Sequence, residues 1–152
     1  MSLHRLQQMA QRVMAKLGKG QKECIYARAL NLEMNAAGIG HRYEVDVPIM
    51  YNQQCVGHGR ADLIMGNIVI EVKAVKAEPR DAADQVARYV ENLTMVEHKD
   101  FVGVVINFCQ TTGRARVYTL DDDLSLIERK AIVSKPPVVR SRFFTRSHNK
   151  SF

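Results

Sequence analysis

Apolar residues recur along this chain with two different periods, and these periods divide it into helices and strands. Some segments place apolar side chains three or four residues apart, as the buried face of an amphipathic helix does. Others are short and either continuously apolar or alternating, as strands are. The predicted helices cover residues 3–17, 21–37 and 79–96, and the predicted strands cover residues 43–51, 54–57, 61–65, 68–75, 101–109 and 114–120.

Turn signals support these boundaries. Gly38 is a suitable C-terminal stop for the second helix. Turn signals at Asn52, at Gly57-His58-Gly59 and at Gly66-Asn67 separate the predicted strands. Asp121-Asp122-Asp123 ends the last strand and could cap a short helical turn. The order of the elements predicts an α/β fold with a sheet and flanking helices.

Size and composition indicate one compact domain, since the chain has 152 residues of which 46% are hydrophobic. No apolar run approaches the ~20 residues of a membrane helix, so no membrane insertion is expected. The amphipathic N-terminal segment, residues 1–17, contains three basic residues and does not resemble a signal peptide.

The cysteine pattern points to a reducing compartment. Cys24, Cys55 and Cys109 are scattered, odd in number and without the spacing of a zinc site, which is typical of reduced cysteines that serve mostly in packing. We therefore expect an intracellular protein of the cytoplasm, nucleoid or nucleus, with a virion as the other location considered.

Charge is unevenly distributed along the chain. Residues 1–128 hold 15 Lys and Arg against 16 Asp and Glu, whereas residues 129–152 hold seven bases and no acid, which together give the net charge of +6. We therefore predict a near-neutral domain, residues 1–128, and a basic C-terminal tail, residues 129–152. Such a tail could bind a nucleic-acid backbone or an acidic partner, or simply remain solvated. The candidate nucleic-acid contacts in it are Arg140, Arg142 and Arg146.

Two acids and a lysine interrupt neighbouring apolar strands. Asp62 lies in one strand, and Glu71 and Lys73 lie in the next, where the period of two puts them on one face and turns Val72 to the other. Unpaired carboxylates are costly in a sheet interior, and a divalent cation bound by Asp62 and Glu71 would explain them. Lys73 would then orient the attacking water or stabilise negative charge, as in metal-dependent phosphodiester hydrolysis. The alternative is a structural salt bridge between Lys73 and one of the two acids.

Further motifs occur in a fixed order around these residues. They are Gly20-Gln21-Lys22-Glu23-Cys24-Ile25-Tyr26 with Ala29-Leu30 and Glu33, Val47-Pro48-Ile49 with Tyr51, residues 57–63, residues 70–75, Gln85 with Tyr89, and Gly103 with Ile106-Asn107-Phe108. Through them the chain resembles the PD-(D/E)XK nuclease superfamily, and within it the group named for its GxxExxY signature. An isolated E-x-K motif is common by chance, but this ordered set is specific. The resemblance covers about residues 17–108, and nothing from about Thr111 onward matches the family pattern.

The resemblance implies a three-layer, restriction-endonuclease-like core in which helices flank a mixed β-sheet. It also implies that Asp62 and Glu71 bind Mg²⁺ or Mn²⁺, with the Val72 carbonyl as a further ligand, that Lys73 is the catalytic lysine and that Glu23 is an outer acid near the metal. The first acid stands in Arg60-Ala61-Asp62 rather than in the Pro-Asp of many relatives.

The pair Gln85 and Tyr89 is similar to the Q-x-x-x-Y element of helicase-linked recombination exonucleases. Its spacing puts both side chains on one helix face, where they could position DNA or the lysine. Tyr89 could instead only pack in the core.

Several nearby residues have two interpretations. Glu23 could be a surface acid or a partner for Arg60, and Arg60 could contact a phosphate or neutralise the carboxylates. Gly57 and Gly59 are interpreted as hairpin residues, and His58 as incidental unless it assists proton transfer.

The expected function is metal-dependent hydrolysis of phosphodiester bonds in DNA, in repair, recombination or the processing of viral or mobile DNA, with RNA as the other polynucleotide considered. The alternative is a non-catalytic component of a larger assembly, such as a virus particle or nucleoprotein complex, that keeps the fold and docks through its basic tail. A nucleic-acid binder without turnover is the third hypothesis.

Overall fold

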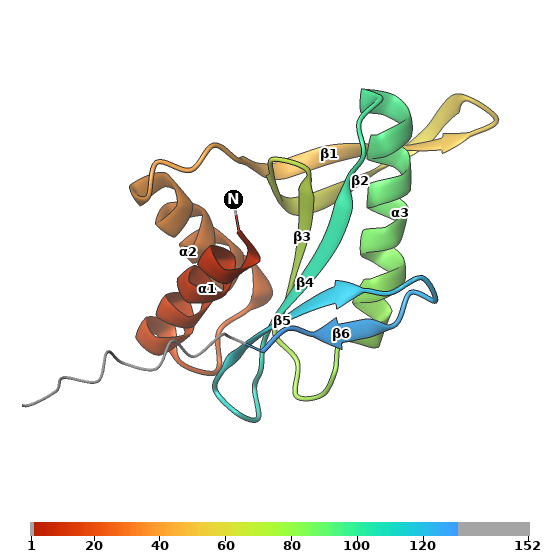
Figure 1. Cartoon of the computed structure of the whole chain (residues 1–152). Helices are drawn as coiled ribbons and strands as arrows, with labels where there is room; N and C mark the ends of the chain where they lie inside the picture. The colour runs from red at the N-terminus through yellow and green to blue at the C-terminus, as the bar shows by residue number, and fades with distance from the viewer. Residues whose placement is uncertain (1, 131–152) are drawn as a thin grey trace, which may run out of the picture.

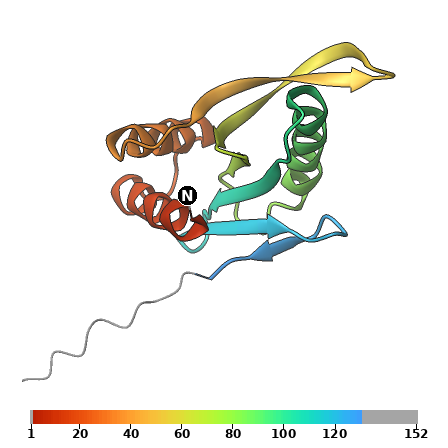
Figure 2. The same cartoon turned by 45° about the horizontal axis from the view of Figure 1, so that its top comes forward.

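The computed structural model describes residues 2–130, which form three layers (Figure 1). The helices are α1 (Leu3–Leu17), α2 (Glu23–Ala36) and α3 (Arg80–Glu97), and the strands are β1 (Arg42–Tyr51), β2 (Gln54–Met65), β3 (Ile68–Lys73), β4 (Val102–Phe108), β5 (Ala115–Leu120) and β6 (Leu126–Glu128). The six strands form one sheet in chain order, with α1 and α2 on one face and α3 on the other (Figure 2). The predicted three-layer α/β fold is confirmed.

One connection makes the sheet mixed. β3 and β4 pair in parallel, whereas the other neighbouring strands are antiparallel. A parallel pair requires the chain to return along the sheet, and α3 provides that return across one face. Consequently α3 begins shortly after Lys73, the last residue of β3. The start of α3 is thus joined by a short loop to the strand that carries Glu71 and Lys73.

The two sheet faces bury separate apolar clusters. The cluster under α1 and α2 includes Leu6, Met9, Tyr26, Leu30, Ile70, Val72, Ile106 and Phe108. The cluster under α3 includes Val47, Ala61, Val69, Val86, Tyr89, Leu93, Val105 and Tyr118. Since Val69 packs on the α3 side and Val72 on the opposite side, the strand alternation of β3 places Glu71 in the α3 layer. Glu71 and Val72 therefore face opposite layers, as the sequence predicted.

The predicted turn at Gly57-His58-Gly59 is wrong, because β2 runs without interruption through it and pairs with β1, Gly59 lying opposite Val47. The turn of this hairpin lies at Asn52 and Gln53, whose φ angles are 46° and 63°, so the turn predicted at Asn52 is confirmed. Gly59 has a packing role: a Cβ there would lie 2.6 Å from Tyr89 Cε1, so only glycine lets α3 approach β2 this closely.

The predicted helical turn after β5 is also wrong. Asp121 Oδ1 accepts hydrogen bonds from the N–H groups of Asp123 and Ser125 at 3.0 and 2.8 Å, which shapes a hairpin turn into the unpredicted strand β6. The proposed boundary between residues 128 and 129 stays a prediction. Arg140, Arg142 and Arg146 lie outside the described residues.

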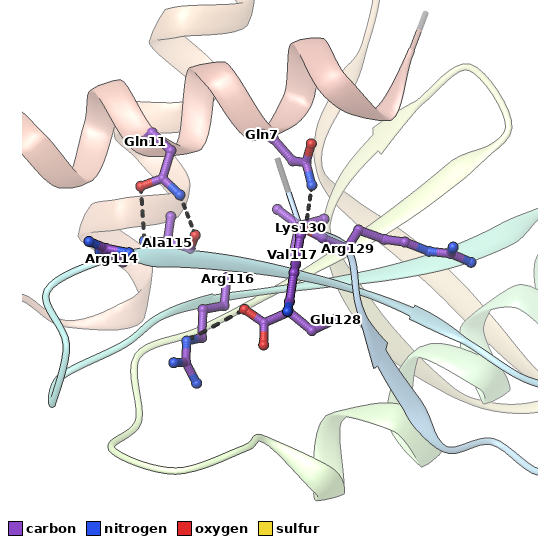
Figure 3. A pocket seen from close by; sticks show the side chains of 9 residues that line it. All are labelled: Gln7, Gln11, Arg114, Ala115, Arg116, Val117, Glu128, Arg129 and Lys130. Carbon is purple, nitrogen blue, oxygen red and sulfur yellow. Dashed lines mark hydrogen bonds and ion pairs between the residues drawn. The ribbon is translucent and has the colours of Figure 1, made fainter. Parts of the chain in front are cut away.

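Glutamines of α1 fasten that helix to the sheet beside β6 (Figure 3). Gln11 donates to the Ala115 carbonyl at 2.5 Å and accepts from the Ala115 N–H at 3.3 Å, while Gln7 donates to the Arg129 carbonyl at 2.5 Å. The hollow between these elements is lined by Arg114, Arg116, Arg129 and Lys130, together with Glu128. No helix within residues 2–130 is long and apolar enough to cross a membrane.

Candidate active site

The strands β2 and β3 separate where their acidic residues stand. Backbone pairing between them extends only from Met65 opposite Ile68 to Leu63 opposite Ile70, although β3 continues to Lys73. Beyond the last pair, Asp62 Oδ2 accepts a hydrogen bond from the Val72 N–H at 2.8 Å. This bond replaces the missing strand pairing and fixes the Asp62 carboxylate beside β3.

Glu71 is a buried carboxylate with an unused oxygen. Its exposed fraction is 5%, and its Oε2 atom has no hydrogen-bond partner among the described residues. Burial, reinforced by the nearby charge of Asp62, raises the pKa of Glu71 to about 8. Burial also raises the pKa of Asp62, although its hydrogen bond from Val72 acts in the opposite direction. The two acids therefore share a poorly solvated site in which their charges repel each other.

Lys73 lies close enough to influence both carboxylates. Against the effect of burial, its charge lowers the pKa of Asp62 and of Glu71. Within the described part of the chain, however, no carboxylate forms an ion pair with Lys73. The structure therefore gives no support to the alternative of a structural salt bridge, and the ammonium group is not tied to either acid.

The donor atoms suit a hard cation better than a structural zinc ion. Residues 2–130 contain no group of three or more His, Cys, Asp and Glu side chains arranged to hold a metal. Zinc sites in proteins generally need three or four such ligands, whereas Mg²⁺ is often bound by one or two carboxylates with waters and substrate phosphates. The unsatisfied Oε2 of Glu71 beside Asp62 fits that second kind of site. The role of the Val72 carbonyl stays a prediction.

Glu23 is held near these acids by the tyrosine of its own motif. It is the first residue of α2, and its charge adds to burial in raising the pKa of Asp62 and Glu71. The Tyr26 hydroxyl donates to the Gly18 carbonyl at 2.6 Å, and the Tyr26 ring stacks on Phe108 with centroids 4.5 Å apart. These contacts lock the start of α2 against β4. The charge of Glu23 therefore acts on the two acids from an exposed position.

Two amides that the sequence analysis did not assign a role support this arrangement. Gln110 accepts from the Gly20 N–H at 2.7 Å and donates to the Tyr26 hydroxyl at 3.2 Å, so it joins the loop before α2 to the end of β4. The only sequence signal for Gln110 was an amide that closely follows a buried strand. Its partners come from a segment about ninety residues away in the chain.

Asn107 is the second of these amides. It lies opposite Lys73 in the parallel pair of β3 and β4, and only 1% of it is exposed. Its side chain accepts from the Val75 N–H at 3.0 Å and donates to the carbonyls of Val75 and Ala77 at 3.3 and 3.2 Å. Asn107 therefore fixes the backbone that directly follows Lys73. A lone amide inside an otherwise apolar strand was the signal that could have identified it.

On α3, Gln85 and Tyr89 do face each other as the spacing predicted. Gln85 Nε2 donates to the Tyr89 hydroxyl at 3.1 Å, and Tyr89 packs against Gly59 on β2 with 8% of its surface exposed. Tyr89 thus belongs to the core cluster and also holds a polar partner. A contact of this pair with DNA or with Lys73 stays a prediction.

Arg60 forms an ion pair with a different acid from Glu23, the partner considered in the sequence analysis. Arg60 Nη1 lies 3.8 Å from Glu44 Oε2, so its ion-pair partner among the described residues is Glu44 rather than Glu23. Its charge also lowers the pKa of Asp62 against the effect of burial. The Arg60 side chain is 65% exposed, which leaves it accessible to a phosphate.

Comparison with known proteins agrees with the motifs. The family model of the PD-(D/E)XK nuclease superfamily matches residues 2–118, which include every described residue of this site. The predicted extent of the resemblance, about residues 17–108, was therefore too short, since the match also includes α1 and residues from Thr111 to Tyr118. Searches of curated proteins and of solved structures gave no significant match. The narrower GxxExxY group stays a prediction.

Proposed function

Because the chain belongs to the PD-(D/E)XK nuclease superfamily, we propose that it is a metal-dependent nuclease that hydrolyses phosphodiester bonds in DNA. One observation carries this proposal: a buried carboxylate oxygen of Glu71 without a partner among the described residues, beside a second, half-buried acid, Asp62. Such an arrangement is costly in a protein without a ligand. A divalent cation offsets that cost and gives both acids a role.

The two acids and the lysine would have different roles, the acids in metal binding and the lysine in hydrogen-bond donation. Asp62 and Glu71 would hold Mg²⁺ or Mn²⁺, with the Val72 carbonyl as a further ligand. The bound ion would polarise the scissile phosphate and lower the pKa of a bound water. Lys73, which no acid binds in an ion pair within residues 2–130, would donate hydrogen bonds to the attacking water or to the negative charge of the transition state.

Other residues would position the substrate and the site. Glu23 would act as an outer acid, and Gln85 with Tyr89 would orient DNA or Lys73 from α3. The exposed guanidinium of Arg60 would contact a phosphate. Arg140, Arg142 and Arg146 would add affinity through charge, so that binding weakens as the salt concentration rises.

Cleavage of labelled single- and double-stranded DNA with Mg²⁺ or Mn²⁺ tests the proposal. Wild type should cut, Lys73→Ala and Glu71→Ala should not, and Lys76→Ala, which removes an exposed lysine from the following loop, should retain activity. Product lengths distinguish attack at the ends from internal attack, and an RNA of the same sequence tests the other polynucleotide.

The opposite result has a defined meaning. If wild type cuts no better than Lys73→Ala while it is folded and binds DNA, the nuclease proposal is wrong. A non-catalytic role, as a nucleic-acid binder or as a component of a larger assembly, would then fit the chain better.

A further inference from the structure

A thiol, an imidazole and a carboxylate form a second chemical group on the β1–β2 hairpin, which extends past α3 (Figure 1). Cys55 Sγ lies 3.6 Å from His58 Nε2, and His58 Nδ1 lies 2.9 Å from Asp46 Oδ2. All three residues are exposed. The sequence analysis interpreted Cys55 as a packing residue and His58 as incidental, so neither interpretation accounts for this arrangement.

An irregularity of the hairpin brings the thiol to the imidazole. In a regular strand, residues three apart face opposite sides of the sheet. Here the register shifts between Ile49 and Met50, so that Gly57 and Cys55 lie opposite these two residues and Val56 has no partner on β1. The extra residue in β2 is a β-bulge, which turns Cys55 to the side of His58. The carbonyl of Gly57 accepts from the Cys55 thiol at 3.3 Å and holds the sulfur there.

The carboxylate comes from the other strand of the hairpin. Val45 and Val47 pack toward α3, so Asp46 between them faces the opposite side of β1, where His58 also lies. Asp46 accepts from Nδ1 and therefore fixes the ring so that Nε2 points to the sulfur. A nucleophile, a base within reach and a third group that orients the base are the parts of an activated nucleophile.

We propose that Cys55 is a reactive thiol, activated by His58 and Asp46, that exchanges with low-molecular-weight disulfides and becomes modified as a mixed disulfide. The Cys55 S–H rotates from the Gly57 carbonyl to His58 Nε2 and transfers its proton there, and the thiolate attacks one sulfur of the disulfide. The new Sγ–S bond forms as the S–S bond of the reagent breaks, and the departing thiolate takes the proton from His58. The protein thiol is oxidised and the small disulfide is reduced, so no other oxidant is needed. This inference does not depend on the nuclease activity.

The test measures the rate at which oxidised glutathione modifies the full chain at neutral pH, with intact mass and peptide mapping to locate the adduct. Every variant carries Cys24→Ser, because Cys24 lies in the first turn of α2, where a helix N-terminus also activates thiols. Cys109 is buried and serves as an internal reference thiol that the reagent should not reach.

Cys55 in the folded chain should react at least about tenfold faster than in the same chain unfolded in urea. His58→Gln should remove most of that acceleration, and Asp46→Asn should remove part of it. Arg42→Gln is the control, since it changes an exposed charged residue of the same hairpin that lies outside the thiol's contacts, and it should leave the rate within about twofold. Circular dichroism verifies that each variant is folded.

Two results would overturn the inference. One is a folded-state rate no higher than the unfolded-state rate. The other is an unchanged rate in both His58→Gln and Asp46→Asn, which would mean that the neighbouring groups do not activate the sulfur.

Discussion

The buried carboxylate of Glu71 should make the stability of the metal-free protein depend on pH, and Glu71→Gln should reduce that dependence. Burial beside Asp62 raises the pKa of Glu71 from 4.5 to about 8. Between these values the folded protein keeps a proton that the unfolded chain has released. Since the folded state binds more protons, the free energy of unfolding falls as the pH rises. The stabilisation is complete below pH 4.5 and is lost as the pH rises through about 8.

The size of the effect has an upper bound and a more realistic value. Each pH unit between the two pKa values corresponds to about 1.4 kcal/mol, so the interval from 4.5 to about 8 gives a ceiling of about 5 kcal/mol. The charge of Lys73 opposes the shift, and water entering the site would reduce it further. We therefore expect wild type to lose about 1–3 kcal/mol, the usual cost of a buried polar group without a partner.

Urea unfolding at pH 5 and pH 8.5 with a chelator present measures this difference. Glu71→Gln should show a smaller loss than wild type, with the remainder due to Asp62, whose pKa burial also raises. The control Glu91→Gln, which changes an exposed glutamate of α3, should lose as much as wild type.

Adding Mg²⁺ or Mn²⁺ at pH 8.5 should restore the stability of wild type and not that of Glu71→Gln, because only wild type offers both carboxylates. The reasoning is refuted if wild type is equally stable at the two pH values, or if Glu71→Gln loses as much as wild type does.

Three further changes test other contacts. Gly59→Ala should destabilise the fold by about 1–3 kcal/mol and reduce cleavage, because the added Cβ would meet Tyr89. Gly57→Ala is the control, since its Cβ has open space, and equal effects of the two substitutions in thermal unfolding would contradict the packing role of Gly59. Asn107→Ala should lower the free energy of unfolding in urea by about 2–4 kcal/mol and slow cleavage, since it leaves buried backbone groups without partners. An unchanged free energy of unfolding would disprove the role of that amide. Removing residues 131–152 deletes five bases and should reduce the slope of log K against log salt for duplex DNA by up to about 4. An unchanged slope would mean that residues 131–152 make no phosphate contact.

The sequence predicted elements where one strong local pattern decides the structure. The amphipathic stripe of α1 gave the observed bounds of residues 3–17, and the apolar run of β4 gave a central strand within one residue at each end. Gly57 and Gly59 misled the prediction because glycine also serves close packing, and the partner of Gly59 is a tyrosine on a distant helix. β6 was missed because three residues are too few to show an alternation.

The same distinction applies to the candidate site. Asp62, Glu71 and Lys73 could be identified from the sequence, because charged side chains in apolar strands are conspicuous wherever the strands lie. Asn107 is conspicuous as a lone amide in an apolar strand, but its role and that of Gln110 could not be predicted, since their partners are largely backbone groups that strand register and loop placement bring to them.

The bonds between Gln11 and Ala115 have a consequence for self-association. β6 pairs only with residues 118–120 of β5, so the first half of β5 would otherwise present unpaired N–H and C=O groups at the rim of the sheet. Gln11 occupies both backbone groups of Ala115, and the Arg129 N–H binds the Val117 carbonyl at 2.8 Å. These occupied groups are not available to pair with a strand from a second molecule. The Gln11 side chain of α1 therefore opposes edge-to-edge aggregation at this part of β5.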